Sequence, residues 1–194
     1  MVVIADIKNF KLINNIYGIR VGDDILRHLA KIISKAWTDG LAARYSDDQF
    51  VVFTPIPQND FEKHLENAVR YISENAPIAN LLVKYGVYKG VDKSLSISEI
   101  CDRAIMAMKS IQLNYEKNIA YYDDQIGQQH IREVMMENDF ENALRNEEFE
   151  VWFQPKYNAQ TEKIAGAEAL IRWRKQDGSM VSHGAFIPLF ERDG

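Results

Sequence analysis

The chain has 194 residues, of which 46% are hydrophobic and 26% are charged, and its formal net charge at pH 7 is -5. This composition indicates a globular protein with one or two domains, and the negative charge argues against a nucleic acid polymer as partner because phosphate contacts need a basic surface. The single cysteine, Cys101, excludes an internal disulfide and favours the cytoplasm, and we find neither a signal peptide nor an apolar run near the roughly 20 residues of a membrane span.

The first elements are a strand, a turn and a helix. The apolar run Val2–Ile7 is broken only by Asp6, which predicts a buried strand that ends in a carboxylate. Residues 14–18 are rich in Asn and Gly, which favours a turn. From Gly22 to Ala36 the apolar residues recur at the spacing of a helix that packs on one face.

A β-hairpin is expected next. Two apolar runs, Leu41–Ala43 and Phe50–Phe53, flank a polar cluster at residues 46–49. The tip carries two adjacent carboxylates, Asp47 and Asp48. A metal ion could use them, or they could simply keep the turn in water.

The remaining elements of the first two thirds complete a layered fold. We expect a helix at 59–74 that Asn59 or Asp60 caps, a half-buried strand at 81–87, a helix that opens with a capping box at 96–99, and a short strand at 119–122. This order predicts an α/β class, or a palm-like α+β layer, with a mixed sheet flanked by helices.

The final third forms a separate group of elements. A polar connector at 123–129 leads into a helix that ends near Arg145. Two strand-like segments come next, Phe149–Tyr157 and Lys163–Trp173, and then a helix at His183–Glu191. The chain starts inside a strand pattern and ends without a terminal signal, so we expect a longer parent protein.

Several motifs resemble the GGDEF domain of diguanylate cyclases. The end of the first strand and the residues after it resemble the family's Asp-x-Asp-x-Phe-Lys-x-Ile-Asn-Asp, and a degenerate pentamer stands where the family has Gly-Gly-Asp-Glu-Phe. The segments are Asp6–Asn15, Tyr17-Gly18, Gly22-Asp23, Ser46-Asp47-Asp48-Gln49-Phe50, Cys101–Ala104 and Lys109.

The resemblance implies a damaged catalytic site. The family holds its Mg²⁺ or Mn²⁺ with the first strand's Asp, here Asp6, and with the Glu of the signature, where this chain has Gln49. A neutral amide cannot replace a carboxylate on a hard cation. Lys8 stands where the family has a further acid, and Asp48 remains as a weak ligand. We therefore expect weak or absent metal binding and no cyclase activity from Ser46–Phe50.

Nucleotide binding is a separate expectation. The resemblance makes Asn14 and Asp23 contacts to guanine and makes Lys11 and Lys109 contacts to phosphates, so GTP is a candidate ligand. Ordinary turn or helix-end chemistry explains the same residues. The family's usual His and Gly-Arg are also replaced, by Ile19 and by Gln112-Leu113.

The last third resembles the first part of an EAL phosphodiesterase domain, a β/α barrel that would be incomplete here. The resemblance makes Glu168 a metal ligand and makes Gln154 and Arg172 contacts to cyclic di-GMP. The segments are Trp152–Pro155, Gly166–Leu170, Ile171–Trp173 and Phe186–Leu189. We expect a degenerate GGDEF domain at 1–123, a connecting helix at 124–146 and the EAL part at 147–194.

The favoured hypothesis is a bacterial cyclic di-GMP signalling protein. Its inactive GGDEF module would regulate an attached EAL phosphodiesterase, with GTP as the candidate signal, and this chain alone would be inactive. One alternative is residual diguanylate cyclase activity through Asp6 and Asp48. Another is a scaffold without ligand that acts by forming a homodimer.

Overall fold

The computed structural model describes residues 1–55, 57–79, 81–112 and 114–193, and only the backbone of Gln58, Arg192 and Asp193. Leu113 lies outside the described residues. The chain divides into two compact units, Met1–Gly127 and Gln128–Gly194. The predicted limits of the three domains remain predictions.

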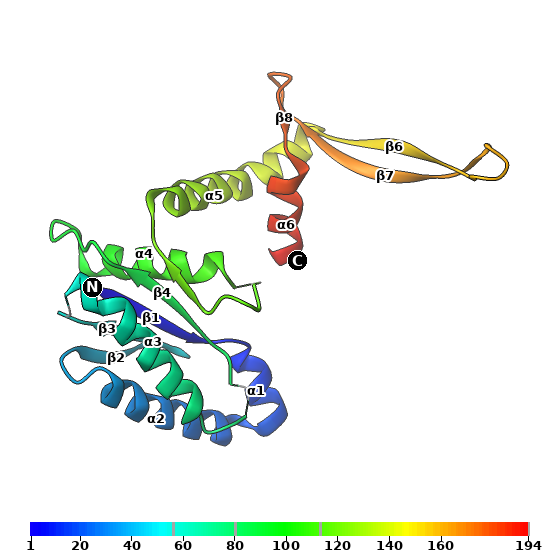
Figure 1. Ribbon diagram of the computed structural model, residues 1–194. Helices are drawn as coiled ribbons and strands as arrows, with labels where there is room; N and C mark the ends of the chain where they lie inside the picture. The colour runs from blue at the N-terminus through cyan, green and yellow to red at the C-terminus, as the bar shows by residue number, and fades with distance from the viewer. Residues whose placement is uncertain (56, 80, 113, 194) are drawn as a thin grey trace. The chain divides into compact units, whose positions relative to one another are not determined.

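The first unit contains a five-stranded mixed sheet, as predicted (Figure 1). The strand order is β2-β3-β1-β4-β5; β4 and β5 are parallel, and the other neighbours are antiparallel. The strands are β1 (Val2–Ile7), β2 (Leu41–Ser46), β3 (Gln49–Phe53), β4 (Val83–Tyr88) and β5 (Ile119–Tyr121).

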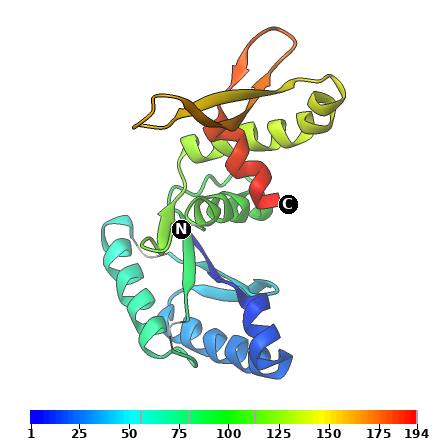
Figure 2. The same ribbon diagram turned by 90° about the vertical axis from the view of Figure 1, so that its right-hand side faces the viewer.

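Helices cover both faces of this sheet (Figures 1 and 2). Alternate β1 side chains such as Val3 and Ala5 join the core formed with α2 (Ile19–Ala36) and α3 (Gln58–Glu74). Val2 and Ile4 point to the other face and pack with side chains of α4 (Ile97–Ser110). All six residues of β1 are therefore buried, which explains its nearly unbroken apolar sequence.

Three local predictions need correction. Residues 14–18, expected to be a turn, belong mostly to helix α1 (Phe10–Tyr17), because burial of Phe10 outweighs the weak helix propensity of asparagine. Helix α3 begins at Gln58 after Pro57, before the predicted caps. Strand β4 is buried at every residue instead of half-buried, because helices cover both sides. The capping box of Ser96 and Glu99 is confirmed.

Two histidines connect α2 and α3, and each bonds the C-terminal end of the other helix. His28 on α2 donates a ring N–H to the carbonyl oxygen of Asn75, the C-cap of α3, at 2.9 Å. His64 on α3 donates to the carbonyl oxygen of Ala36, the last residue of α2, at 3.0 Å, and its ring lies 4.6 Å from that of Trp37. Each helix therefore satisfies a terminal carbonyl of the other.

The second unit contains a helix, an antiparallel hairpin and a final helix. Its elements are α5 (Asp124–Arg145), β6 (Phe149–Tyr157), β7 (Ile164–Arg174), β8 (Met180–Val181) and α6 (His183–Asp193). Helix α5 begins inside the predicted polar connector because the Asp123 carboxylate accepts the backbone N–H of Ile126 at 2.8 Å. The core is an aromatic cluster in which Trp173 is fully buried against Phe149 and Phe186.

The β6–β7 hairpin extends beyond the helices of its own unit (Figure 1). Val151 and Phe153 on β6 are 59% and 70% exposed, and Ile171 on β7 is 39% exposed. None of the described helices, in either unit, is long and apolar enough to cross a membrane.

Gly86 on β4 determines how closely α4 approaches the sheet. A Cβ at this position would overlap the Ala104 carbonyl oxygen and would lie 2.7 Å from the Met108 nitrogen, both backbone atoms of α4. The helix cannot give way without losing its contacts along β1 and β4. Gly90, by contrast, has open space around it.

We predict that Gly86→Ala destabilises the first unit by at least about 2 kcal/mol through overpacking, which lowers the unfolding midpoint by roughly 6–12 °C. Thermal unfolding followed by circular dichroism measures the change. Gly90→Ala is the matched control and should move the midpoint by about 2 °C or less. Equal midpoints for the two variants would contradict the close approach of α4.

Candidate functional site

Where β1 ends beside the start of β3, a hydrogen bond joins Asp6, an expected metal ligand, to Gln49, which stands where the cyclase family has a second ligand. Asp6 on β1 and Gln49 on β3 are direct cross-strand partners. The Gln49 amide Nε2 donates to Asp6 Oδ1 at 3.0 Å. Asp6 is 7% exposed, so this bond satisfies a buried carboxylate.

Two buried lysines lie next to this pair. Lys84 on β4 is the other cross-strand partner of Asp6, and its side chain is fully buried. Its ammonium donates to the carbonyl oxygens of Asn114 and Lys117 and, at 3.2 Å, to Oδ1 of Asn118. Burial and the charge of nearby Lys8 lower the pKa of Lys84.

Lys8 is held in a similar way. It is 9% exposed, its Nζ donates to the carbonyl oxygen of Gln112 at 2.9 Å, and it lies 3.6 Å from the centre of the Tyr115 ring. The two ammonium groups thus fix the segment that joins α4 to β5. Neither lysine forms an ion pair within the part of the chain that the structure describes.

The hairpin tip is ordered by Arg44. Its guanidinium donates to the carbonyl oxygen of Asp47, through Nε at 3.0 Å and also through Nη2. Asp48 is half-buried, and burial, followed by the charge of Asp6, raises its pKa. Ser46 pairs with Gln49 across the turn, and Asp47 is exposed.

These residues do not fit a divalent cation. Asp6 uses one carboxylate oxygen to accept from the Gln49 amide, and the amide nitrogen that stands there cannot coordinate a cation. The pKa of Asp48 is raised because burial and the charge of Asp6 outweigh the opposing charge of Arg44. Among the described residues no group of three or more His, Cys, Asp or Glu side chains could hold a metal ion.

A pocket of about 340 Å³ lies between α2 and the hairpin. Asp23 is at this pocket, together with Arg27 of the same helix and Arg44 of β2. Leu26, Ala30 and Phe50 form its apolar walls. A carboxylate beside two guanidinium groups and an apolar wall can bind a planar base that carries N–H donors and a negatively charged group.

Asn14 lies close to the same helix. Its Oδ1 is buried and has no hydrogen-bond partner among the described residues, and a Cβ on Gly22 would overlap that oxygen. Gly22 precedes Asp23, so the side chain of Asn14 packs where α1 meets the start of the pocket wall. A buried acceptor without a partner is costly, and a ligand donor would satisfy it.

The structure does not bring the other two predicted nucleotide ligands to this pocket. Lys11 on α1 and Lys109 on α4 are both exposed, and neither lines it. Lys109 lies in the last turn of α4, where a positive charge is also favourable for the helix dipole.

The predicted residues of the EAL part share one face of the β6–β7 hairpin. Gln154 lies directly opposite Glu168, and Arg172 comes four residues after Glu168, so all three side chains point to the same face. Glu168 forms an ion pair of 2.9 Å with Lys156, and the Arg172 guanidinium lies 5.7 Å from the Trp152 ring.

The sequence analysis did not identify Lys84 as part of the site, although the sequence contains a signal for it. Its strand reads as an apolar segment in which a lysine is the one charged residue. A lysine inside a strand that is buried on both faces needs hydrogen-bond acceptors nearby. The acceptors lie 30–34 residues further along the chain, which is why local pattern did not identify them.

We predict that Asp48→Asn stabilises the first unit at pH 7. The folded pKa of Asp48 is raised, so its ionised form costs stability above that pKa, and the cost disappears as the pH falls through it. The gain at pH 7 should be at most about 1 kcal/mol because solvent screens this half-buried position. Chemical denaturation at pH 7 and pH 4 measures it; Asp47→Asn is the control, and a destabilised Asp48→Asn would contradict the account.

Comparison with known proteins supports two families along this chain. The family model "Diguanylate cyclase, GGDEF domain" matches residues 1–118, and the family model "EAL domain" matches residues 137–194. The signaling protein YkoW of Bacillus subtilis is 28% identical over 100% of this chain and 25% of its own length. The cyclic di-GMP phosphodiesterase NbdA of Pseudomonas aeruginosa is 26% identical, with the same coverage. The chain thus spans about a quarter of these relatives.

Solved structures show the same fold. The S helix-GGDEF-EAL region of Vibrio cholerae LapD, bound to c-di-GMP, has a TM-score of 0.60 and 17% identity over 98% of this chain and 46% of that one. The active GGEEF domain of a Vibrio cholerae diguanylate cyclase has a TM-score of 0.54 and 23% identity over 63% of this chain and 81% of that one. The chain belongs to the GGDEF diguanylate cyclase domain family, and its last part is the N-terminal portion of an EAL domain.

Proposed function

We propose that this chain is part of a cyclic di-GMP signalling protein in which an inactive GGDEF domain regulates an attached EAL phosphodiesterase by binding GTP. The observation that carries the proposal is the hydrogen bond from Gln49 to Asp6. It occupies, within the protein, the carboxylate that a metal-dependent cyclase would need for its cation.

Synthesis of cyclic di-GMP requires attack of a hydroxyl on a triphosphate, with cations that neutralise the developing charge. In this chain the candidate carboxylates are Asp6, which is hydrogen-bonded to an amide, and Asp48, whose pKa is raised. Asp6 and Asp48 together offer too few anionic oxygens for a divalent cation.

Guanine binding is supported by features of the first unit that do not depend on a metal ion. The pocket beside α2 keeps Asp23 at its wall, and Asn14 presents an acceptor without a partner next to Gly22. A carboxylate accepts the N1–H and N2–H donors of guanine. The pocket arginines add positive charge for the phosphates, although Arg27 also pairs with Asp24 and Arg44 with the Asp47 carbonyl oxygen. The pocket volume of about 340 Å³ accommodates the base.

Helix α5 supports the regulatory part of the proposal. It runs without a break from Asp124 to Arg145, so it begins in the first unit and continues into the second. A continuous helix can transmit a change in one domain to the next. Several relatives carry a phosphodiesterase in their names, NbdA among them.

Isothermal titration calorimetry with GTP tests the binding step. We expect a dissociation constant in the micromolar to millimolar range, about tenfold weaker binding for Asp23→Asn and for Asn14→Ala, and little difference with or without Mg²⁺. The controls are Asp39→Asn and Asn15→Ala, exposed residues of the same types. The absence of heat at millimolar GTP, or equal binding of ATP, would overturn guanine recognition.

We also predict that Gln49→Glu creates a metal-responsive protein. Without divalent cations the new carboxylate repels Asp6 across the strands, so the unfolding midpoint should fall by several degrees. Millimolar Mn²⁺ should recover most of that loss by binding the folded state, whereas the unchanged chain should show no shift. Gln160→Glu, at an exposed turn, is the control. A variant that neither loses stability nor responds to Mn²⁺ would contradict the account of this site.

A further inference from the structure

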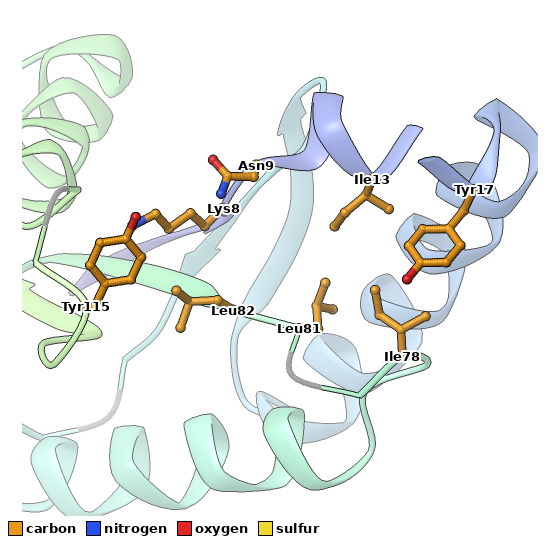
Figure 3. Close-up of a pocket in the computed structure, with 8 residues that line it drawn as sticks. All are labelled: Lys8, Asn9, Ile13, Tyr17, Ile78, Leu81, Leu82 and Tyr115. Carbon is orange, nitrogen blue, oxygen red and sulfur yellow. The ribbon is translucent and has the colours of Figure 1, made fainter. Parts of the chain in front are cut away.

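A second pocket lies on the first unit, away from the wall of α2. Its volume is about 230 Å³, and it is bounded by the end of β1, by α1, by the segment before β4 and by the segment after α4 (Figure 3). The backbone N–H of Lys8 donates to the carbonyl oxygen of Leu82 at 2.9 Å, which joins two of these walls. The lining residues are Lys8, Asn9, Ile13, Tyr17, Ile78, Leu81, Leu82 and Tyr115.

The two ends of this pocket differ in chemistry. Lys8 and Tyr115 lie together at one end, and Ile13, Ile78 and Leu81 gather at the other (Figure 3). The hydroxyl of Tyr17 points toward these aliphatic side chains (Figure 3). The pocket therefore combines a cationic, aromatic end with an apolar end.

Among the residues that the structure describes, none forms an ion pair with the lysine at the cationic end. Lys8 is 9% exposed, and the hydrogen bond that its Nζ donates goes to a neutral carbonyl, that of Gln112. Lys84 lies close enough to interact with Lys8 electrostatically, and it too is bound by neutral oxygens. Over the described residues neither ammonium has a carboxylate within ion-pair distance. Buried positive charges that form no ion pair are costly, and an anion bound at Lys8 would reduce that cost.

We propose that this pocket binds a small monocarboxylate with an aromatic or branched apolar body. The carboxylate would accept from the Lys8 ammonium at the Tyr115 end, and the apolar body would lie against Ile13, Ile78 and Leu81. The volume limits the body to about one or two fused rings, since a cavity of about 150 Å³ holds one benzene. A phosphate group fits less well because its second charge needs more donors than one lysine and a tyrosine provide.

This site is separate from the guanine pocket beside Asp23, since the two have no lining residue in common. The proposal therefore does not depend on GTP binding. It gives the first unit a second ligand, whose contacts would reach β1, α1 and the segment that joins α4 to β5 at once.

Nuclear magnetic resonance titration with 2-naphthoate tests the proposal, and neutral 2-naphthamide is the matched probe. We expect shifts of the backbone amides near Lys8, Tyr17 and Leu81, with a dissociation constant near the millimolar range and at least about tenfold tighter binding of the carboxylate than of the amide. Acetate, which has the charge without the apolar body, should bind at least about tenfold more weakly than 2-naphthoate.

Two variants locate the site. Lys8→Met keeps most of the stem and should reduce 2-naphthoate binding to the level of the amide. Lys31→Met, at an exposed position of α2, should leave the binding unchanged. If Lys8→Met does not fold, the comparison of carboxylate with amide on the unchanged chain still decides the matter. Equal affinity for the two probes, shifts confined to the Asp23 pocket, or complete displacement by GTP would overturn the proposal.

Discussion

The hydrogen bond from the Gln49 amide to the Asp6 carboxylate determines the chemistry of the first unit. It joins the end of β1 to the start of β3, at a buried position where a carboxylate without a hydrogen-bond donor would be costly. An amide solves this problem inside the protein, whereas a second carboxylate would need a cation. The same fold can therefore be stable without a metal ion. Gln49 differs from a glutamate by one nitrogen in place of one oxygen, and this difference removes one negative charge from the site.

On the other side of β1, two buried lysines are likewise satisfied by hydrogen bonds to groups of the protein itself. Lys84 occupies the cross-strand position next to Asp6, and Lys8 comes directly after the strand end. Both ammonium groups donate to carbonyl oxygens of the segment between α4 and β5. Lysines of the sheet therefore hold in place a loop that comes much later in the sequence. The centre of the domain is thus held together by fixed side-chain charges and amides, and both candidate pockets lie at its margins.

Local patterns predicted the elements that depend on local causes. The buried strand Val2–Ile7 and the capping box at Ser96 are recognisable because their signals are within a few residues. Helix α1 was missed since its asparagines favour turns in isolation, and only packing of Phe10 decides otherwise. The bond from Lys8 to Gln112 joins residues 104 positions apart, so no local pattern could indicate it. The family resemblance indicated that Asp6 and residue 49 belong to one site, and they are hydrogen-bonded, whereas Lys11 and Lys109 do not line the pocket that contains Asp23.

The paired histidine contacts between α2 and α3 also support the pocket that contains Asp23. Asp23, Leu26 and Ala30 form one wall of that pocket, and all three belong to α2. His28 in the middle of α2 bonds the C-terminal end of α3, and His64 of α3 bonds the C-terminal end of α2, so this wall is fixed to the neighbouring helix at two points. A ligand in this pocket would contact a helix that is fixed to its neighbour, so any movement of α2 on binding would also move α3.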